Sequence, residues 1–574
     1  MKKLITLLTT ALLISSPVWA QQKNEFEING WQIHEYNIPK VKEAILKAGE
    51  YGVNTIIFSH ALYRHTEAFL AGDANFDEAK AIADPYMGRY YRNADSNHSK
   101  PSRFFQNDIK TLGNLCVQNG LKYFIWTHEL DGLPEEFLKD GKADMDNPKL
   151  YKHLKDRYQQ LFKILPDASG MVLTLHETDY KVFRDEDVST SMTVAERIYK
   201  VTKLLYDVLK ENNKTLIVRN FFYENFELEA FADALKRLPD DIIVMNKPVP
   251  HEFHPFYPPD PMHGNVGKKR QLIEIDLGVE KALTRDGTYA QTEFIQRFAR
   301  RAKEKNLAGM VGRCRLFYDD PFKESHEVNL YAFSQFMNNP QLSVEEVLTS
   351  WAKKRYPYAP EAADYLCSAF KRTQFINHNG RYFLEWWLTK SLGAEWGDYP
   401  YYLGHIHERT RFKWTKDPAD EKLEYKLIFP DDQIFAELVA EKEKVIEAVR
   451  TSINDLTKAK RWLKPDDGKA LDEGFNVLLD AVLLQREWTR AFFAMRLYMQ
   501  NPDEKYEIIL KDALNRMQQQ EMAVKVPYGL DPSSGRRYNI DKFVLEMQWR
   551  MANRKRAIEE DKRILSNAGY QPPE

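Results

Sequence analysis

The sequence predicts an α/β protein, a (β/α)8 TIM barrel followed by an all-helical C-terminal domain. From residue 28 to residue 340, short apolar runs rich in β-branched residues alternate with longer amphipathic stretches, as in repeated βα units. Beyond residue 340, stretches of helical periodicity follow one another without a strand pattern. A chain of 574 residues also exceeds what one hydrophobic core organises, so we expect two domains, 28–340 and 341–574.

The barrel prediction depends on strands that alternate with helices. Helices predicted at 41–51, 107–118, 195–211 and 292–305 each lead into a strand, and Gly52 ends the first of them. We expect seven strands, at 54–58, 123–126, 171–175, 216–218, 242–245, 272–275 and 309–312. Seven strands with helices between them favour a closed eight-stranded barrel over an open sheet, and one strand stays unassigned.

The C-terminal domain is expected to contain long helices at 437–456, 474–498 and 540–565. The middle helix is so rich in apolar residues that it should be buried among its neighbours. The charged segment 416–426 is expected to be a solvated loop. We also expect that a homodimer, if one forms, associates through this helical domain.

The N-terminus has the features of a secretory signal peptide. Lys2 and Lys3 precede an apolar stretch at 4–13, and Val18 and Ala20 form a small-x-small cleavage pattern. This stretch is too short to cross a bilayer. No cysteine that could carry a lipid anchor follows it before residue 116. We therefore expect residues 1–20 to be removed and the mature protein to be periplasmic or secreted, with no membrane association.

Composition and motifs exclude several classes of function. The formal net charge of −2 provides no basic field for nucleic acid. Three scattered cysteines are too few for a disulfide framework or a structural zinc site. The sequence lacks a P-loop, a dinucleotide-binding glycine motif, Gly-x-Ser-x-Gly and His-Glu-x-x-His, and His-Ile-His-Glu at 405–408 has no second ligand cluster. We therefore expect neither a cofactor nor a metal.

Polar residues follow five predicted strands, at the position where barrel enzymes carry their active sites. Trp126 leads into His128 and Glu129, and this strand-end position makes all three candidates for substrate binding. The other four strand ends carry Glu177, Arg219, Lys247 and Glu274. Aromatic clusters at 221–223 and 253–257 suit a glycan, because the C–H faces of sugars stack on aromatic rings.

Hydrolysis of a glycosidic bond needs two carboxyl groups, one to protonate the leaving oxygen and one to activate water or to attack the sugar. Glu177, Glu252, Glu274 and Glu280 lie in suitable regions of the sequence. No other chemistry is as well supplied, so the residues point to a glycosidase.

The same segments resemble glycoside hydrolase family 67, the α-glucuronidases that remove glucuronic acid from xylan side chains. The resemblance extends over residues 38–356 and is carried by short motifs. These are Val-Leu-Thr-Leu-His-Glu at 172–177, Val-Arg-Asn-Phe-Phe-Tyr-Glu at 218–224, Asn-Lys-Pro-Val-Pro-His-Glu-Phe at 246–253 and Glu-Ile-Asp-Leu-Gly-Val-Glu at 274–280.

The resemblance implies a role for each matched residue. Glu177 takes the place of the general acid. Glu252 and Glu280 take the places of two base carboxylates, at a spacing of 28 residues (280 − 252) similar to that of the family. Arg219 and Lys247 match positions that bind the sugar carboxylate, which an arginine fork and a lysine can recognise. Glu274 opens the last motif and is a substrate-binding candidate.

Three departures from the family pattern bear on the substrate. Leu173 stands where the family has a lysine that helps to hold the sugar carboxylate, so one positive contact is expected to be missing. Glu252 replaces an aspartate and is longer by one methylene. The family's N-terminal accessory domain is expected to be absent, because the barrel pattern begins soon after the signal peptide.

The leading hypothesis is an exported, inverting glycosidase that removes an α-linked uronic acid or a related sugar from a polysaccharide or oligosaccharide. One alternative is a hexosaminidase-like exo-glycosidase, although the segment 176–179 lacks the adjacent Asp-Glu pair of that mechanism. Another alternative is a glycan-binding protein with a decayed barrel site. The arrangement of Glu177, Glu252 and Glu280 around one pocket would separate these hypotheses.

Overall fold

The computed structural model describes most of the chain. The described residues are 25–35, 37–59, 69–70, 106–128, 130–176, 178–278, 280, 282–284, 287–314, 322, 326–386, 399–411, 417–525 and 540–570. The expected signal peptide, Glu129 and Glu177 lie outside them.

Eight parallel strands close into a barrel, which confirms the predicted fold class. In chain order the strands are β1 (Ile28–Ile33), β2 (Thr55–Phe58), β3 (Lys122–His128), β6 (Gly170–Thr174), β8 (Thr215–Arg219), β9 (Ile243–Asn246), β10 (Arg270–Asp276) and β11 (Gly309–Cys314). The first strand pairs with β2 on one side and with β11 on the other, which closes the barrel. It is the strand that the sequence left unassigned.

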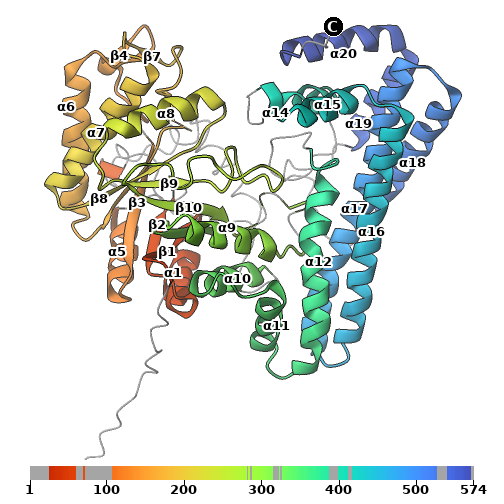
Figure 1. Cartoon of the computed structure of the whole chain (residues 1–574), viewed down its shortest axis with the longest axis horizontal. Helices are drawn as coiled ribbons and strands as arrows, with labels where there is room; N and C mark the ends of the chain where they lie inside the picture. Colours follow the sequence, from red (N-terminus) through yellow and green to blue (C-terminus); the bar gives the residue numbers. More distant parts are fainter. Residues whose placement is uncertain are drawn as a thin grey trace, which may run out of the picture.

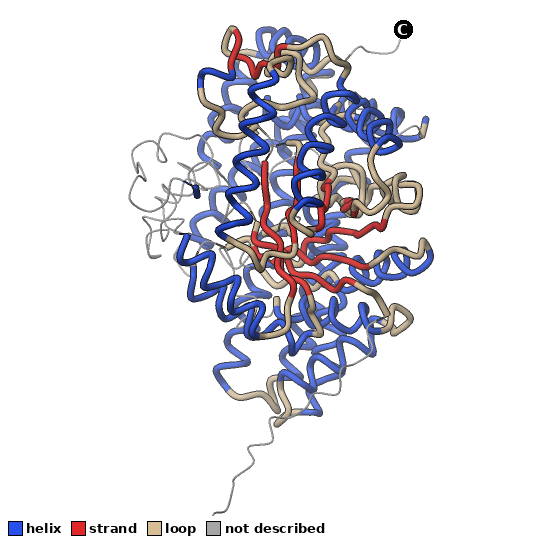
Figure 2. The backbone as a smooth tube through the Cα atoms, turned by 90° about the vertical axis from the view of Figure 1, so that its left-hand side faces the viewer, coloured by secondary structure: helices blue, strands red, loops and turns tan. Residues whose placement is uncertain are grey.

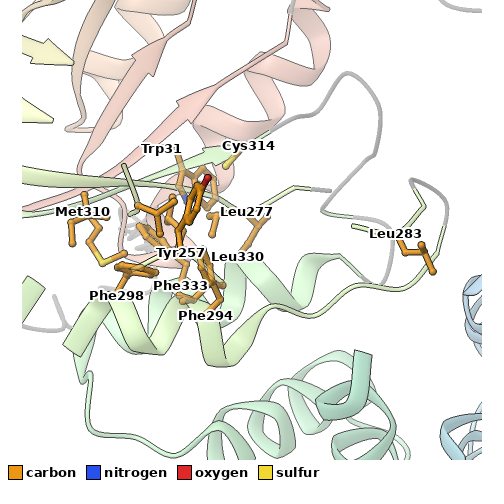
Figure 3. Close-up of a cluster of buried hydrophobic side chains, with 14 of the residues drawn as sticks. Trp31, Tyr257, Leu277, Leu283, Phe294, Phe298, Met310, Cys314, Leu330 and Phe333 are labelled. Atoms are coloured by element: carbon orange, nitrogen blue, oxygen red, sulfur yellow. The ribbon is translucent and has the colours of Figure 1, made fainter. Parts of the chain in front are cut away.

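Alternation along the strands separates two apolar layers. The layer inside the barrel is small and consists of Ile28, Ile57, Phe124, Trp126, Val172, Ile217, Ile243, Met245, Leu272 and Val311. The other apolar strand residues face the surrounding helices in a much larger core. Figure 3 shows part of that core, where Trp31, Met310 and Cys314 from the strands meet Phe294, Phe298, Leu330 and Phe333 from the helices.

Helices surround the barrel (Figure 2), but the connection from β9 to β10 contains no helix. They are α1 (Ile38–Lys47), α5 (Gln106–Gln118), α6 (Pro148–Ile164), α7 (Val194–Glu211), α8 (Asn225–Arg237), α9 (Thr292–Glu304) and α10 (Glu327–Asn338). Thr193 and Glu196 form a capping box that begins α7. The connection from β9 to β10 over residues 247–269, all of them described, consists of turns and bends. This long loop contributes to the candidate site.

A small sheet of β4 (Leu138–Lys139), β5 (Lys142–Asp144) and β7 (Val188–Ser189) lies in the connections after β3 and β6. Short 3-10 helices occur at Ala48–Tyr51, Glu135–Phe137 and Pro360–Ala362. At the end of the first of these, Gly52 adopts a left-handed conformation with φ 65°, as expected for a glycine that ends a helix.

The C-terminal half is helical (Figure 1). Its helices are α11 (Val344–Arg355), α12 (Ala363–Arg381), α13 (Tyr399–His405), α14 (Glu408–Arg411), α15 (Pro418–Ile428), α16 (Asp432–Ala459), α17 (Pro465–Gln500), α18 (Glu504–Lys525), α19 (Ile540–Ala552) and α20 (Arg554–Asn567). The long helices α12, α16, α17 and α18 pack side by side in this order, and α12 also contacts α9 of the barrel. None of the described helices has the length and apolar character needed to cross a membrane.

Two local predictions for this half are wrong. Most of the segment 416–426 is helical, because Asp417 caps α15 by accepting a hydrogen bond from the backbone of Ala419 and Pro418 occupies the first helical position. The helix predicted over 540–565 is two helices, α19 and α20, which are interrupted at Asn553 (φ −122°, ψ 37°).

Candidate active site

Three buried cations lie at the carboxyl ends of the barrel strands. Arg219 ends β8, Lys247 directly follows β9, and Arg313 is the last inward-facing residue of β11. They point inward because they continue the alternation of Ile217, Met245 and Val311, which belong to the layer inside the barrel. Each cation has at least one carboxylate partner, so the mouth of the barrel is a network of ion pairs.

Arg219 and Glu274 form a two-pronged ion pair across the barrel. The guanidinium donates from Nε to Oε2 at 2.5 Å and from Nη2 to Oε1 at 3.1 Å. The same guanidinium lies over the rings of Trp126 and Phe221, at 4.9 and 5.3 Å from their centroids. The structure therefore brings together three predicted substrate-binding residues, Trp126, Arg219 and Glu274.

Lys247 pairs with Glu252, a predicted base. The ammonium lies 2.7 Å from the Glu252 carboxylate and over the rings of Phe221 and Phe253, at 4.1 and 4.5 Å. Burial lowers the pKa of Lys247 to about 8; Glu252 opposes this shift and the positive charge of Arg219 adds to it. Glu252 itself has a left-handed backbone with φ 52°, which costs about 1 kcal/mol for a residue with a side chain.

Arg313 pairs with the second predicted base. Its guanidinium contacts Glu280, and its Nε donates to Oδ1 of Asp276 at 3.1 Å. The backbone N–H of Glu280 donates to the other oxygen of Asp276 at 3.1 Å. Arg313 also lies 4.6 Å from the centroid of the Phe253 ring, over which Lys247 lies as well. Glu252 and Glu280 therefore belong to one cluster, and Glu280 is a buried residue of the mouth.

Arg313 and Asp276 are the functional candidates that the sequence interpretation did not select. Arg313 directly follows the predicted strand 309–312, so the strand-end rule that selected Arg219 applies equally to it. Asp276 lies two residues after Glu274 on the same strand, so both side chains face inward.

The side-chain direction of Leu173 corrects the expectation that a positive contact is missing at this position. Its side chain lies in the outer core between the barrel and the helices, whereas its neighbour Val172 faces inward. A lysine at position 173 would therefore not point into the mouth, and the expected loss of a positive contact does not follow from this position. The third cation in the mouth, beside Arg219 and Lys247, is Arg313.

His128 is buried and bonded through both ring nitrogens. Trp126 donates from Nε1 to Nε2 of His128 at 3.1 Å, and Nδ1 of His128 lies 2.9 Å from the carbonyl oxygen of His176. This pattern requires the neutral ring with its proton on Nδ1. His128 therefore joins the end of β3 to the backbone next to Glu177, and its predicted role in substrate binding stays a prediction.

His176 fixes the strand end that leads to Glu177. Its Nε2 lies 3.1 Å from Glu227 of α8, and its ring stacks on Phe183 at 4.5 Å. Burial alone would raise the pKa of Glu227, but the hydrogen bond from His176 and further donors, which include Arg184, hold that pKa below its ordinary value. Glu177 and Glu129 lie outside the described residues, so their predicted roles stay predictions.

Among the residues that the structure describes, no group of three or more His, Cys, Asp or Glu side chains is arranged to hold a metal ion. In the segment 405–408, His407 instead pairs with Glu424 at 2.7 Å, and Nδ1 of His405 lies 2.7 Å from the carbonyl oxygen of Tyr401.

No protein-family model and no curated protein matches the chain. Among solved structures, a GH138 enzyme targeting pectin rhamnogalacturonan II is 12% identical with a TM-score of 0.61, over 94% of this chain and 85% of that one. A mutant of the Thermobaculum terrenum O-GlcNAc hydrolase (12% identity, 93% and 97% covered) has a TM-score of 0.44. CpGH84B (12% identity, 91% and 77% covered) has a TM-score of 0.42. The chain thus shares its fold, over both the barrel and the helical half, with a glycoside hydrolase of family GH138.

Proposed function

We propose that the protein is a glycoside hydrolase that acts at the carboxyl-terminal mouth of its barrel on a glycan containing a uronic acid. One observation carries the proposal. The barrel mouth contains three buried cations and four carboxylates, which form ion pairs with one another. Carboxyl groups in pairs perform glycoside hydrolysis, and guanidinium and ammonium groups bind a sugar carboxylate. Phe221 and Phe253 add flat apolar surfaces beside the cations.

In the proposed mechanism Glu177 protonates the leaving oxygen, while Glu252 and Glu280 orient and deprotonate one water. In the free enzyme, Lys247 and Arg313 stabilise the negative charge that these two carboxylates need as bases. Direct attack by water inverts the anomeric carbon, and it requires about 6.5 to 9.5 Å between acid and base. Proton NMR of the first-formed anomer tests this mechanism. A retained configuration would remove Glu252 and Glu280 as water-activating bases.

The ion pairs indicate where a substrate carboxylate would bind. Each cation already has a carboxylate partner, so a uronate must share or replace one of them. Replacement costs least at Lys247, because the side chain of Glu252 is 18% exposed and belongs to a strained loop residue. It costs more at Arg219, whose partner Glu274 is fully buried and bound through two hydrogen bonds.

A panel of matched glycosides tests the substrate class. It pairs α-glucuronide with α-glucoside and α-galacturonide with α-galactoside, and it includes an N-acetylhexosaminide. Pectin rhamnogalacturonan II completes the panel, because the structurally similar GH138 enzyme targets it. We expect kcat/KM for a uronide to exceed that of its neutral partner by about 100-fold or more, because only the uronide carboxylate can form charge-assisted hydrogen bonds with the buried cations.

The other outcomes of the panel separate the alternatives. Equal rates on uronide and neutral glycoside would refute uronate recognition and leave glycosidase activity standing. Cleavage of the N-acetylhexosaminide alone would favour the hexosaminidase-like alternative. Binding of oligosaccharides without cleavage would favour the glycan-binding protein.

We further propose that the protein is exported and associates through its helical domain. The two most exposed large apolar side chains among the described residues, Leu545 (65%) and Ile508 (60%), lie on α19 and α18 of this domain, and these two helices contact each other. N-terminal sequencing of the protein recovered outside the cytoplasm should begin at Gln21. Light scattering during gel filtration should give twice the monomer mass, and Leu545→Glu should return the protein to the monomer.

A further inference from the structure

The C-terminal end of α12, in the helical half, contacts both loops that carry the predicted base carboxylates. Arg381 donates from Nη1 to the backbone carbonyl of Glu280 at 2.9 Å and to that of Ala282 at 3.3 Å. The hydroxyl of the next residue, Tyr382, forms a 2.6 Å hydrogen bond with Nδ1 of His254, two residues beyond Glu252. Two consecutive buried residues of the helical half thus bind two separate loops of the barrel.

The same face of α12 also binds three further described residues of the loop that carries Glu280. Thr373 and Asn377 precede Arg381 by two turns and one turn of the helix, so the three side chains lie on one face. Asn377 accepts a hydrogen bond from the backbone of Leu283 at 3.0 Å and donates to the carbonyl of Thr288 at 3.1 Å. Thr373 accepts from the backbone N–H of residue 290 at 2.9 Å. The loop between β10 and α9 is therefore held by side chains of α12.

The end of α12 is itself fixed within the helical half. Lys442 of α16 is buried, and its ammonium donates to the carbonyl of Asn379 at 2.6 Å and to that of Tyr382. A cation at this position satisfies carbonyl groups that a helix leaves unbonded at its C-terminus. Glu441 pairs with Lys442 at 2.6 Å and accepts from the backbone N–H of Leu384 at 3.0 Å. Arg381 and Tyr382 therefore project from a rigid support.

We propose that Arg381 and Tyr382 are positioning residues, which hold the loops of Glu280 and Glu252 at the separation that the reaction needs. This inference rests on the proposed function, in which these two carboxylates activate one water. Each loop has a direct bond to the end of α12, so the distance between the loops is set by a helix outside the barrel. A displacement of about 1 Å at a reacting group costs up to about 100-fold in rate. The helical half is thereby a part of the active site.

Conservative variants with a matched control test the proposal. Tyr382→Phe removes one hydroxyl and keeps the ring, and Arg381→Lys keeps the charge but shortens the reach to the Glu280 carbonyl. Thr373→Val is the control, because it removes a buried hydroxyl from the same face of α12 that bonds to residue 290, far along the loop. We expect Tyr382→Phe and Arg381→Lys to lower kcat by about 10-fold or more with little change in KM, and Thr373→Val to leave kcat unchanged. If the three variants lower kcat alike, the proposal is wrong.

Hydrogen exchange gives a second readout that does not require activity. In Tyr382→Phe the amides of 249–257 should exchange faster than in the wild type, and in Arg381→Lys the amides of 280 and 282–284 should do so. Thr373→Val should change exchange only at 287–290. If the wild type cleaves no glycoside but the variants show this exchange pattern, the proposed function is wrong, whereas the inference that α12 supports both loops is confirmed. If the wild type is active and exchange in both loops is unchanged, the positioning role is refuted.

Discussion

At the scale of single residues, the charged side chains in the barrel mouth are buried, and each needs an oppositely charged partner to offset the cost of its burial. Arg219 and Glu274 are both buried, and two hydrogen bonds join them. The interior attracts opposite charges strongly, but it also penalises any charge that loses its partner. The residues proposed to bind substrate are therefore also residues on which stability depends.

Replacement of Glu274 by Gln should destabilise the protein by about 3 kcal/mol, because Arg219 would then be buried without a neutralising charge. Urea denaturation measures the change. The control is Glu345→Gln, which removes an exposed ion pair with Lys371 and should change stability by less than about 1 kcal/mol. Equal effects of the two substitutions would contradict a buried, charge-dependent pair at the mouth.

Lys247 should give uronate binding a pH dependence. Burial lowers its pKa to about 8, so the ammonium is present below this pH and is lost as the pH rises through it. We expect kcat/KM for a uronide to fall from about pH 7 to about pH 9, because this ratio reports the titration of the free enzyme. Lys247→Arg keeps its charge throughout this range, so its profile should lack the fall. A fall of the same size in this variant would assign the titration to another group.

At the scale of elements, closure of the barrel depends on the pairing of β1 with β11. The two strands begin their register with Ile28 opposite Gly309. Here the backbones approach so closely that a Cβ on Gly309 would lie 1.8 Å from the carbonyl oxygen of Ile28. Glycine is required at this position because any side chain would separate the first strand from the last.

Gly309→Ala should therefore cost about 3 kcal/mol of unfolding free energy, through displacement of the backbone where β1 and β11 begin to pair. Gly49→Ala is the matched control, because a Cβ there meets nothing within 4 Å, and it should be neutral or slightly stabilising. Thermal or urea unfolding of both variants measures the difference. A stable Gly309→Ala variant would contradict the close approach of the two strands.

At the scale of the whole molecule, the barrel and the helices share one core. The large buried cluster contains Val41 and Phe298 of the barrel helices together with Val445 and Trp488 of the C-terminal helices. Leu283, in the loop beyond β10, extends away from the barrel residues in Figure 3 toward the helical half. A Cβ on Gly380 of α12 would lie 3.0 Å from its side chain. The two halves are thus joined by packing as well as by hydrogen bonds.

We expect the two halves to unfold together. Differential scanning calorimetry should show a single transition in which the calorimetric and van't Hoff enthalpies agree, because loss of either half exposes the apolar surface of the other. Asn377→Ala removes side-chain hydrogen bonds between the halves and should lower the transition temperature without splitting the transition. Two separated transitions in the wild type would show that the halves are energetically independent.

The sequence by itself determined the order and type of most elements and part of the site. Apolar periodicity is a local property, so seven strands and the long helices α16 and α17 were predictable from it. All strands of a barrel end at the same face, so strand-end position was enough to select Arg219, Lys247 and Glu274 for one site. Helix caps are local as well, so the cap that Asp417 provides for α15 could also have been predicted from the sequence.

Only the tertiary structure decided how the barrel closes, which way a side chain points and which distant residues contact one another. The first strand, Ile-Asn-Gly-Trp-Gln-Ile, has no continuous apolar run, and its pairing with β2 and β11 is what identifies it. One residue of register decides that Leu173 faces the helices instead of the mouth. Arg381 and Tyr382 meet the loops of the site from 101 and 128 residues away. Such contacts arise from long-range packing, which a local pattern does not encode.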